Sequence, residues 1–136
     1  MEGKGRITGH TGLLALIGSP VGHSGSPAMY NYSFEKLGLD YAYVAFDIKV
    51  EEVKAALDAM RLFHMRGCNV TMPCKTEAAK YMDELSPAAR IIGAVNTIVN
   101  EDGKLIGHMT DGEGFVGNLR DHGIEIKGKK ITVAGG

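Results

Sequence analysis

The residues best suited to acid–base chemistry are a lysine and an aspartate that each follow an apolar segment. Lys75 ends the segment NVTMPCK, and Asp111 lies in HMTDGEG. Partial burial at the end of a strand lowers the pKa of a lysine and suits it to pass a proton. If the two side chains meet over a substrate hydroxyl, one can orient that group while the other transfers its proton. The structural alternatives are a solvated lysine in the first turn of a helix and an aspartate that caps a helix.

A second group of polar residues offers hydrogen bonds without an obvious reactive atom. Ser24 and Ser26 flank a glycine, where two hydroxyls and nearby backbone N–H groups could hold a carboxylate. Asn69, Thr71 and Asn96 combine donors and acceptors that suit a ligand rich in hydroxyl groups. Taken singly, Ser26 is better explained as a helix N-cap, and each asparagine as a turn residue. The interpretation as a binding site therefore depends on the whole set.

Alternating strands and helices are expected to position these residues. Apolar runs and β-branched residues predict strands, and apolar spacings of three and four predict helices. Ser26 and Ser86 are each followed by proline, which is typical of a helix N-cap and first turn. The predicted order is strand 13–17, helix 26–38, strand 41–48, helix 50–60, strand 67–72, a helix from Pro73, helix 86–93, a hairpin over 94–109, a helix from Thr110 or Asp111 to Gly123 and strand 129–136.

This order predicts an α/β fold. We expect a mostly parallel sheet with helices on both faces, a three-layer αβα arrangement, and one antiparallel strand from the hairpin. In the last helix, Phe115 and Leu119 are expected on the inner face. Ligands of such sheets bind beyond the carboxyl ends of the strands, where the polar residues above are expected to lie.

Composition excludes several other classes of function. The chain has 136 residues and a net charge of -1 from 15 basic and 16 acidic residues, which favours neither nucleic acid nor a membrane surface. The longest early apolar run, 13–17, is too short for a signal sequence, so we expect a cytoplasmic protein. Cys68 and Cys74 are expected to be free thiols. The 5 histidines lack the spacing of a metal site, and none is expected.

Four motifs, GSPVGHSGSPAMYN, NVTMPCK, GAVNT and GHMTDGEG, resemble in order and spacing those of the shikimate and quinate dehydrogenase family. The resemblance covers residues 14–136. It implies that Lys75 and Asp111 form the catalytic pair. It also implies a substrate-binding role for a set of hydrogen-bonding residues, in which two serines bind the substrate carboxylate and the others, with Asp111, bind the ring hydroxyls. These residues are Ser24, Ser26, Asn69, Thr71 and Asn96.

The same resemblance implies reversible reduction of 3-dehydroshikimate to shikimate with NADP(H), a step of aromatic amino-acid biosynthesis. Residues 1–128 would be the substrate-binding catalytic domain, and residues 129–136 the first strand of a dinucleotide-binding domain that is otherwise missing. Gly135 and Gly136 would begin its glycine-rich turn, so the isolated chain is expected to be inactive. Use of quinate or NAD, a homodimer, and a shikimate-binding fragment without catalysis remain open alternatives. Met109 and Cys74 depart from the common family pattern and could tune substrate preference.

Overall fold

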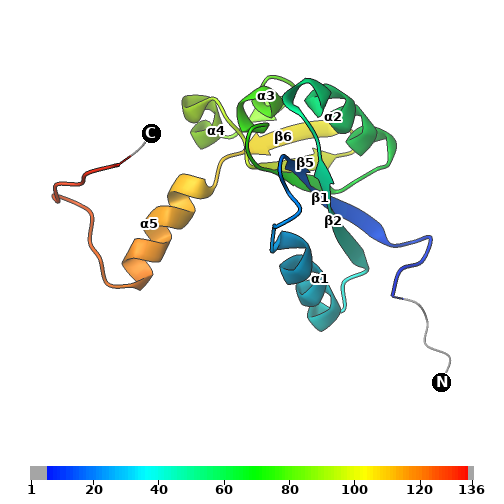
Figure 1. The fold of residues 1–136 in the computed structure, drawn as a ribbon, viewed down its shortest axis with the longest axis horizontal. Coiled ribbons are helices and arrows are strands. Elements are labelled where there is room, and N and C mark those ends of the chain that lie inside the picture. Colours follow the sequence, from blue (N-terminus) through cyan, green and yellow to red (C-terminus); the bar gives the residue numbers. More distant parts are fainter. Residues whose placement is uncertain (1–5, 135–136) are drawn as a thin grey trace.

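In a computed structural model, residues 6–134 are described, and they form one six-stranded sheet with helices around it (Figure 1). The strand order is β2-β1-β3-β5-β6-β4. The strands are β1 (Gly12–Gly18), β2 (Tyr41–Asp47), β3 (Gly67–Val70), β4 (Glu84–Leu85), β5 (Thr97–Glu101) and β6 (Lys104–His108). The helices are α1 (Ser26–Leu37), α2 (Val53–Leu62), which follows a short 3-10 helix (Val50–Glu52), α3 (Lys75–Ala79), α4 (Pro87–Ile92) and α5 (Asp111–Asp121).

The sheet is mostly parallel, as the sequence predicts. Strand β1 pairs in parallel with β2 and β3, and β4 pairs in parallel with β6. Strand β5 runs antiparallel to both of its neighbours, β3 and β6. The β5–β6 hairpin turns at Asp102 and Gly103, whose φ angles of 51° and 96° suit a tight left-handed turn. The expectation of one antiparallel hairpin strand is confirmed.

Helices cover both faces of the sheet, which confirms the three-layer arrangement. On one face, α1 packs Phe34 against Leu16 and Tyr43. On the opposite face, α2, α3 and α4 contribute buried residues such as Leu57 and Ala89 to a larger core (Figure 1). Both predicted ends of α4 are confirmed as well. At its start Ser86 Oγ accepts from the N–H of Ala89, and at its end Gly93 adopts the left-handed conformation.

The starts of α1 and α3 differ from the prediction, and α2 begins at Val53, after the 3-10 turn, rather than at Val50. Ser26 is the first residue of α1 rather than its N-cap, and the hydroxyl that accepts from the Ser26 N–H is that of Ser24, at 3.2 Å. Helix α3 begins at Lys75 rather than Pro73, and β3 ends at Val70. Proline disfavours helical backbone in the residue before it, so a turn over residues 71–74 separates β3 from α3.

The C-terminal part departs further from the prediction. Helix α5 ends as expected, with Gly123 at a φ of 75°. It extends away from the sheet (Figure 1), none of its residues is buried, and Phe115 is 63% exposed. The predicted inner face therefore does not pack on the sheet; Phe115 and Leu119 line a hollow beside residues 124–131. Residues 129–134 form no strand here, since a strand needs a neighbour to take its hydrogen bonds. Gly135 and Gly136 lie outside the described residues.

Candidate active site

The polar site forms at the edge of the sheet where β1 and β3 end. These strands are parallel and paired from Leu14 to Ile17, so the loops that follow them leave the sheet together. The Thr71 N–H donates to the Ile17 carbonyl at 2.9 Å, and the Ser19 N–H donates to the Met72 carbonyl at 3.0 Å. These bonds fix the start of the loop that carries the two serines against the loop that carries Thr71.

Gly18 allows the close approach of these loops. A Cβ atom at this position would lie 2.4 Å from Thr71 Cγ2 and 2.8 Å from the Met72 carbonyl oxygen. The φ of Gly18 is 153°, which other residues rarely adopt. Glycine at the end of β1 therefore sets the position of Thr71.

The proposed catalytic pair is in direct contact. Lys75 Nζ lies 2.5 Å from Asp111 Oδ2. Lys75 is the first residue of α3, and Asp111 is the first residue of α5. The lysine side chain is 26% exposed and the aspartate side chain 56%, so the contact is open on its carboxylate side. An open lysine–carboxylate pair can receive a hydroxyl group and exchange a proton with it.

Asn96 joins the pair through Nδ2 of its side-chain amide, and both ends of the amide bind Thr110. Its Nδ2 donates to Asp111 Oδ1 at 2.7 Å and to Thr110 Oγ1 at 2.9 Å, and its Oδ1 accepts from the Thr110 N–H at 3.1 Å. Asn96 precedes β5, and because β5 is antiparallel, its first residues lie at the edge where β1 and β3 end. The reversed strand thus delivers Asn96 to the site.

The surroundings keep Asp111 ionised. Its pKa is held below the ordinary value, chiefly because Lys75 donates a hydrogen bond to the carboxylate, with a further hydrogen bond from Asn96. Partial desolvation acts in the opposite direction and is outweighed. Asp111 is therefore a hydrogen-bond acceptor at neutral pH, suited to orienting a hydroxyl group.

Asn69 lies in β3, next to this pair. Its Nδ2 donates to the Asn96 carbonyl at 3.4 Å and to Thr97 Oγ1 at 3.3 Å, and its Oδ1 accepts from the Tyr43 hydroxyl at 2.8 Å. Asn69 faces Thr97 directly across the β3–β5 pairing. A hydrogen-bonded series of side chains and one backbone carbonyl therefore runs from Tyr43 through Asn69 and Asn96 to the Lys75–Asp111 pair.

The structure brings four of the predicted residues together and leaves three apart. Lys75, Asp111, Asn96 and Asn69 form the connected group. Thr71 lies beside it on the loop after β3, and the two serines lie on the loop after β1. Three hydroxyl side chains stay apart from the connected group: those of Ser24, Ser26 and Thr71. Among residues 6–134, no hydrogen bond links any of them to that group.

Two contributors to the site were missed from sequence. Thr110 was considered only as a helix cap, although its backbone and hydroxyl both bind Asn96. Tyr43 was considered only as part of a strand. A buried tyrosine hydroxyl usually needs a partner, so its place in the middle of a strand was a usable signal.

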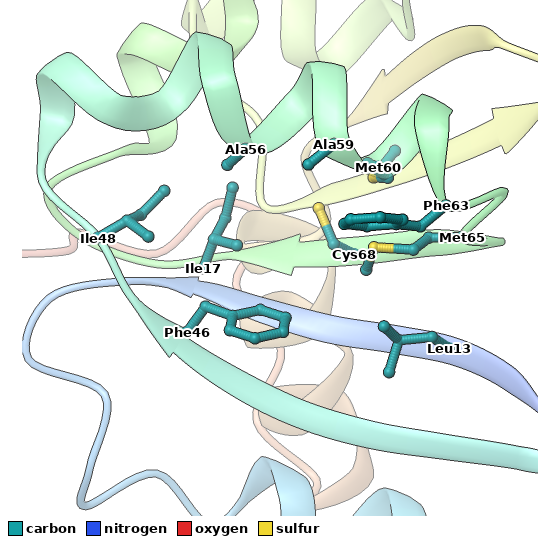
Figure 2. Close-up of a pocket in the computed structure, with 10 residues that line it drawn as sticks. All are labelled: Leu13, Ile17, Phe46, Ile48, Ala56, Ala59, Met60, Phe63, Met65 and Cys68. Carbon is teal, nitrogen blue, oxygen red and sulfur yellow. The ribbon is translucent and has the colours of Figure 1, made fainter.

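A separate hollow lies away from this site and differs from it in chemistry. Figure 2 shows a pocket of about 290 Å³ between α2 and strands β1–β3, lined by apolar side chains such as Ile17, Phe46, Met60 and Cys68. Such a lining offers no partner for a carboxylate or several hydroxyls. Within the described part of the chain, no three His, Cys, Asp or Glu side chains group closely enough to bind a metal ion. No helix among these residues is long and apolar enough to cross a membrane.

Fold and site together define an α/β domain that holds a lysine–aspartate pair at the edge of a mostly parallel sheet. The model of the shikimate dehydrogenase substrate binding domain matches residues 16–98. The chain belongs to this family, as its motifs indicated.

Similar proteins agree with this assignment. Shikimate dehydrogenase (NADP(+)) of Listeria monocytogenes serotype 4b is 53% identical over 130 residues, which cover 96% of this chain and 45% of that protein. The protein of the same name from Streptococcus uberis is 52% identical over 132 residues, with the same coverage. The crystal structure of shikimate 5-dehydrogenase from Listeria monocytogenes in complex with shikimate and NAD has a TM-score of 0.87 at 53% identity, covering 92% of this chain and 43% of that one. The chain thus spans less than half the length of these relatives.

Proposed function

We propose that this chain is the substrate-binding catalytic domain of a shikimate dehydrogenase, which interconverts 3-dehydroshikimate and shikimate with NADP(H). The observation that carries the proposal is the contact of 2.5 Å between Lys75 Nζ and Asp111 Oδ2, with Asn96 bound to the same carboxylate. The family assignment and the relatives named shikimate dehydrogenase (NADP(+)) support the choice of reaction.

In this proposal Lys75 is the general acid/base. When the ketone is reduced, a hydride reaches the carbon, and Lys75 delivers a proton to the oxygen that becomes the hydroxyl. In the reverse direction Lys75 removes that proton. Asp111, held ionised by its neighbours, orients the hydroxyl.

The remaining predicted residues bind the substrate. Asn69, Thr71 and Asn96 offer amide and hydroxyl groups to the ring hydroxyls, and the first and last of them are already in the hydrogen-bonded group around Asp111. Ser24 and Ser26 would bind the substrate carboxylate from the loop after β1. Support for the serines is their location at the same edge of the sheet, since Ser19 of their loop bonds the loop after β3.

The proposed cofactor is NADP(H), with NAD as the alternative, and it supplies or accepts the hydride. Residues 6–134 do not themselves provide the expected cofactor turn, because 129–134 form no strand and the glycines that follow are not described. We propose residues 1–128 as the catalytic domain and 129–136 as the first strand of the cofactor domain. The Listeria monocytogenes structure contains NAD, which keeps that alternative open.

The two residues that depart from the family pattern, Met109 and Cys74, are not placed to contact a substrate. Met109 and Cys74 are 9% and 0% exposed and pack in the core on the α2 face. Quinate therefore remains a second candidate substrate on the basis of family resemblance alone. A cytoplasmic location, which fits two buried free thiols, and a homodimer complete the proposal.

The proposal is tested by titrating shikimate into this chain and monitoring the chemical shifts of its residues by NMR. We expect saturable shifts at Asn69, Asn96 and Asp111, and at the Ser24–Ser26 loop. Quinate serves as the competing ligand, and a neutral cyclohexanetriol without the carboxylate serves as the control for the serines. Absence of shifts with millimolar shikimate would overturn the proposed substrate.

A further inference from the structure

Tyr43 reaches the site from the far side of β1. It lies in β2, whose pairing with β1 sets Tyr43 opposite Leu14, while Asn69 lies opposite Leu16 on the other side of β1. The Tyr43 side chain crosses β1 on the α1 face, and its hydroxyl donates to Asn69 Oδ1 at 2.8 Å. A residue outside all four sequence motifs is thereby in contact with a substrate-binding side chain.

The position of Tyr43 is fixed by α1 at both backbone and ring. Asn31 Nδ2 donates to the Tyr43 carbonyl at 2.8 Å, and the Tyr43 N–H donates to Asn31 Oδ1 at 2.9 Å. The Tyr30 ring stacks on the Tyr43 ring, with centroids 4.4 Å apart and planes 13° from parallel. Tyr43 is only 3% exposed. Its hydroxyl therefore has little freedom to leave Asn69.

The Tyr43 contact and the Asn96 carbonyl together hold the Asn69 amide in one orientation. The Asn96 carbonyl can only accept, so it requires Nδ2 of Asn69 on its side. The Tyr43 hydroxyl then faces Oδ1, and burial raises the pKa of this hydroxyl above its ordinary value, so it remains a donor. One lone pair of Oδ1 stays free to accept from a ligand.

We propose that Tyr43 is a positioning residue that orients the Asn69 amide toward a ring hydroxyl of the substrate. This inference rests on the proposed function, because it assigns Asn69 to substrate binding. Tyr43 itself does not touch the reacting atoms. Without its hydroxyl, the Asn69 amide keeps only two bonds, of 3.3 and 3.4 Å, both on its Nδ2 side.

The decisive variant is Tyr43→Phe, with Tyr30→Phe as the matched control. The control removes a hydroxyl from the same stacked pair while the bond from Tyr43 to Asn69 stays in place. We expect Tyr43→Phe to weaken shikimate binding by about three- to tenfold, the effect of one hydrogen bond. Tyr30→Phe should stay within about twofold of the wild type. Equal affinities of the two variants would overturn the inference and leave the proposed function standing.

A double-mutant cycle separates positioning from a general structural effect. In an Asn69→Ala background, Tyr43→Phe should cause no further loss of affinity, because the group it orients is gone. Additive losses would show that Tyr43 acts by another route and would overturn the inference. Asn69→Asp is a second variant that leaves Tyr43 intact: it keeps an acceptor for the hydroxyl, lacks the Nδ2 donor and should lose affinity. Unchanged affinity of Asn69→Asp would overturn the role of the amide.

An NMR readout tests the contact without any ligand. The side-chain NH₂ signals of Asn69 should shift and broaden in Tyr43→Phe, and remain as in the wild type in Tyr30→Phe. If the wild-type chain did not bind shikimate, the proposed substrate would fail, and these signals would still decide whether Tyr43 orients Asn69. Identical Asn69 signals in both variants would overturn the positioning role.

Discussion

Lys75 Nζ and Asp111 Oδ2 lie 2.5 Å apart although the residues are 36 positions apart in the sequence. Both belong to the first turn of a helix, where an aspartate is favourable and a lysine is not. The carboxylate of α5 thus offsets the unfavourable placement of the lysine on α3. An arrangement that brings a lysine to a helix start and then neutralises it is typical of a functional site.

Replacement of Lys75 should affect turnover far more than binding. Activity can be measured in a chimera that joins residues 1–128 to the remaining part of the Listeria monocytogenes relative. Lys75→Met should lower kcat by about 10²- to 10⁴-fold, the usual contribution of a proton-transfer group. Shikimate affinity should change much less.

Lys80→Met is the control for this variant. Lys80 lies at the other end of α3, where it pairs with Glu77 and does not contact Asp111. It should retain full activity. A Lys75→Met chimera with near-normal kcat would contradict the assigned role of the lysine.

The pair should contribute to stability only where Asp111 is ionised. Its folded-state pKa is below the ordinary value of 3.8, so the contribution is complete above that value and is lost as pH falls through the folded pKa. The free energy of unfolding of the wild type and of Asp111→Asn, measured by urea denaturation from pH 7 to 2, should converge at the acid end. Because the carboxylate is 56% exposed, the difference at pH 7 should be below about 1 kcal/mol. A difference that grows on acidification would contradict this assignment.

A methyl group at Gly18 should separate the two loops of the site. Gly18→Ala places Cβ 2.4 Å from Thr71 Cγ2 in a strained backbone conformation, so we expect a loss of about 1–3 kcal/mol in the free energy of unfolding. Gly22→Ala is the control, since a Cβ there meets nothing within 4 Å. Equal stability of both variants in urea denaturation would show that the loops adjust freely.

The two cysteines should react slowly with thiol reagents in the folded chain. Burial raises the pKa of Cys68 to about 12 and that of Cys74 above its ordinary value, and only the thiolate reacts. We expect the absorbance change with Ellman's reagent at pH 8 to follow unfolding, with fast reaction only in denaturant. Fast modification of Cys68 in the folded chain would mean that the apolar pocket beside it opens to solvent.

Local signals in the sequence were enough for much of the fold. The Ser86–Pro87 start and Gly93 end of α4 depend on their own backbone geometry, and both were predicted correctly. The existence of the β5–β6 hairpin was also predicted correctly. The family motifs also led to the Lys75–Asp111 pair, which no local pattern distinguishes from a solvated lysine and a helix cap.

Features that depend on distant partners could not be predicted. The apolar residues of α5 indicated an inner face, but within the described chain this face lies beside residues 124–131 and not on the sheet. The link from Tyr43 to Asn69 depends on the order of β2, β1 and β3 in the sheet, which the periodicity of a single strand does not contain. The hydroxyl at the start of α1 comes from Ser24 rather than Ser26, because the helix begins one residue earlier than expected, with Gly25 as its N-cap.

The tight turn at Asp102 and Gly103 has a consequence at the opposite end of its hairpin. Asn96 precedes the first strand of the hairpin and Asp111 follows the second, and the pairing of Thr97 with His108 sets their separation. Side chains alternate between the two faces of a strand, so a shift of the pairing by one residue would turn Asn96 toward the wrong layer. An insertion or deletion in that remote turn would therefore separate Asn96 from Asp111 as surely as a substitution of either residue.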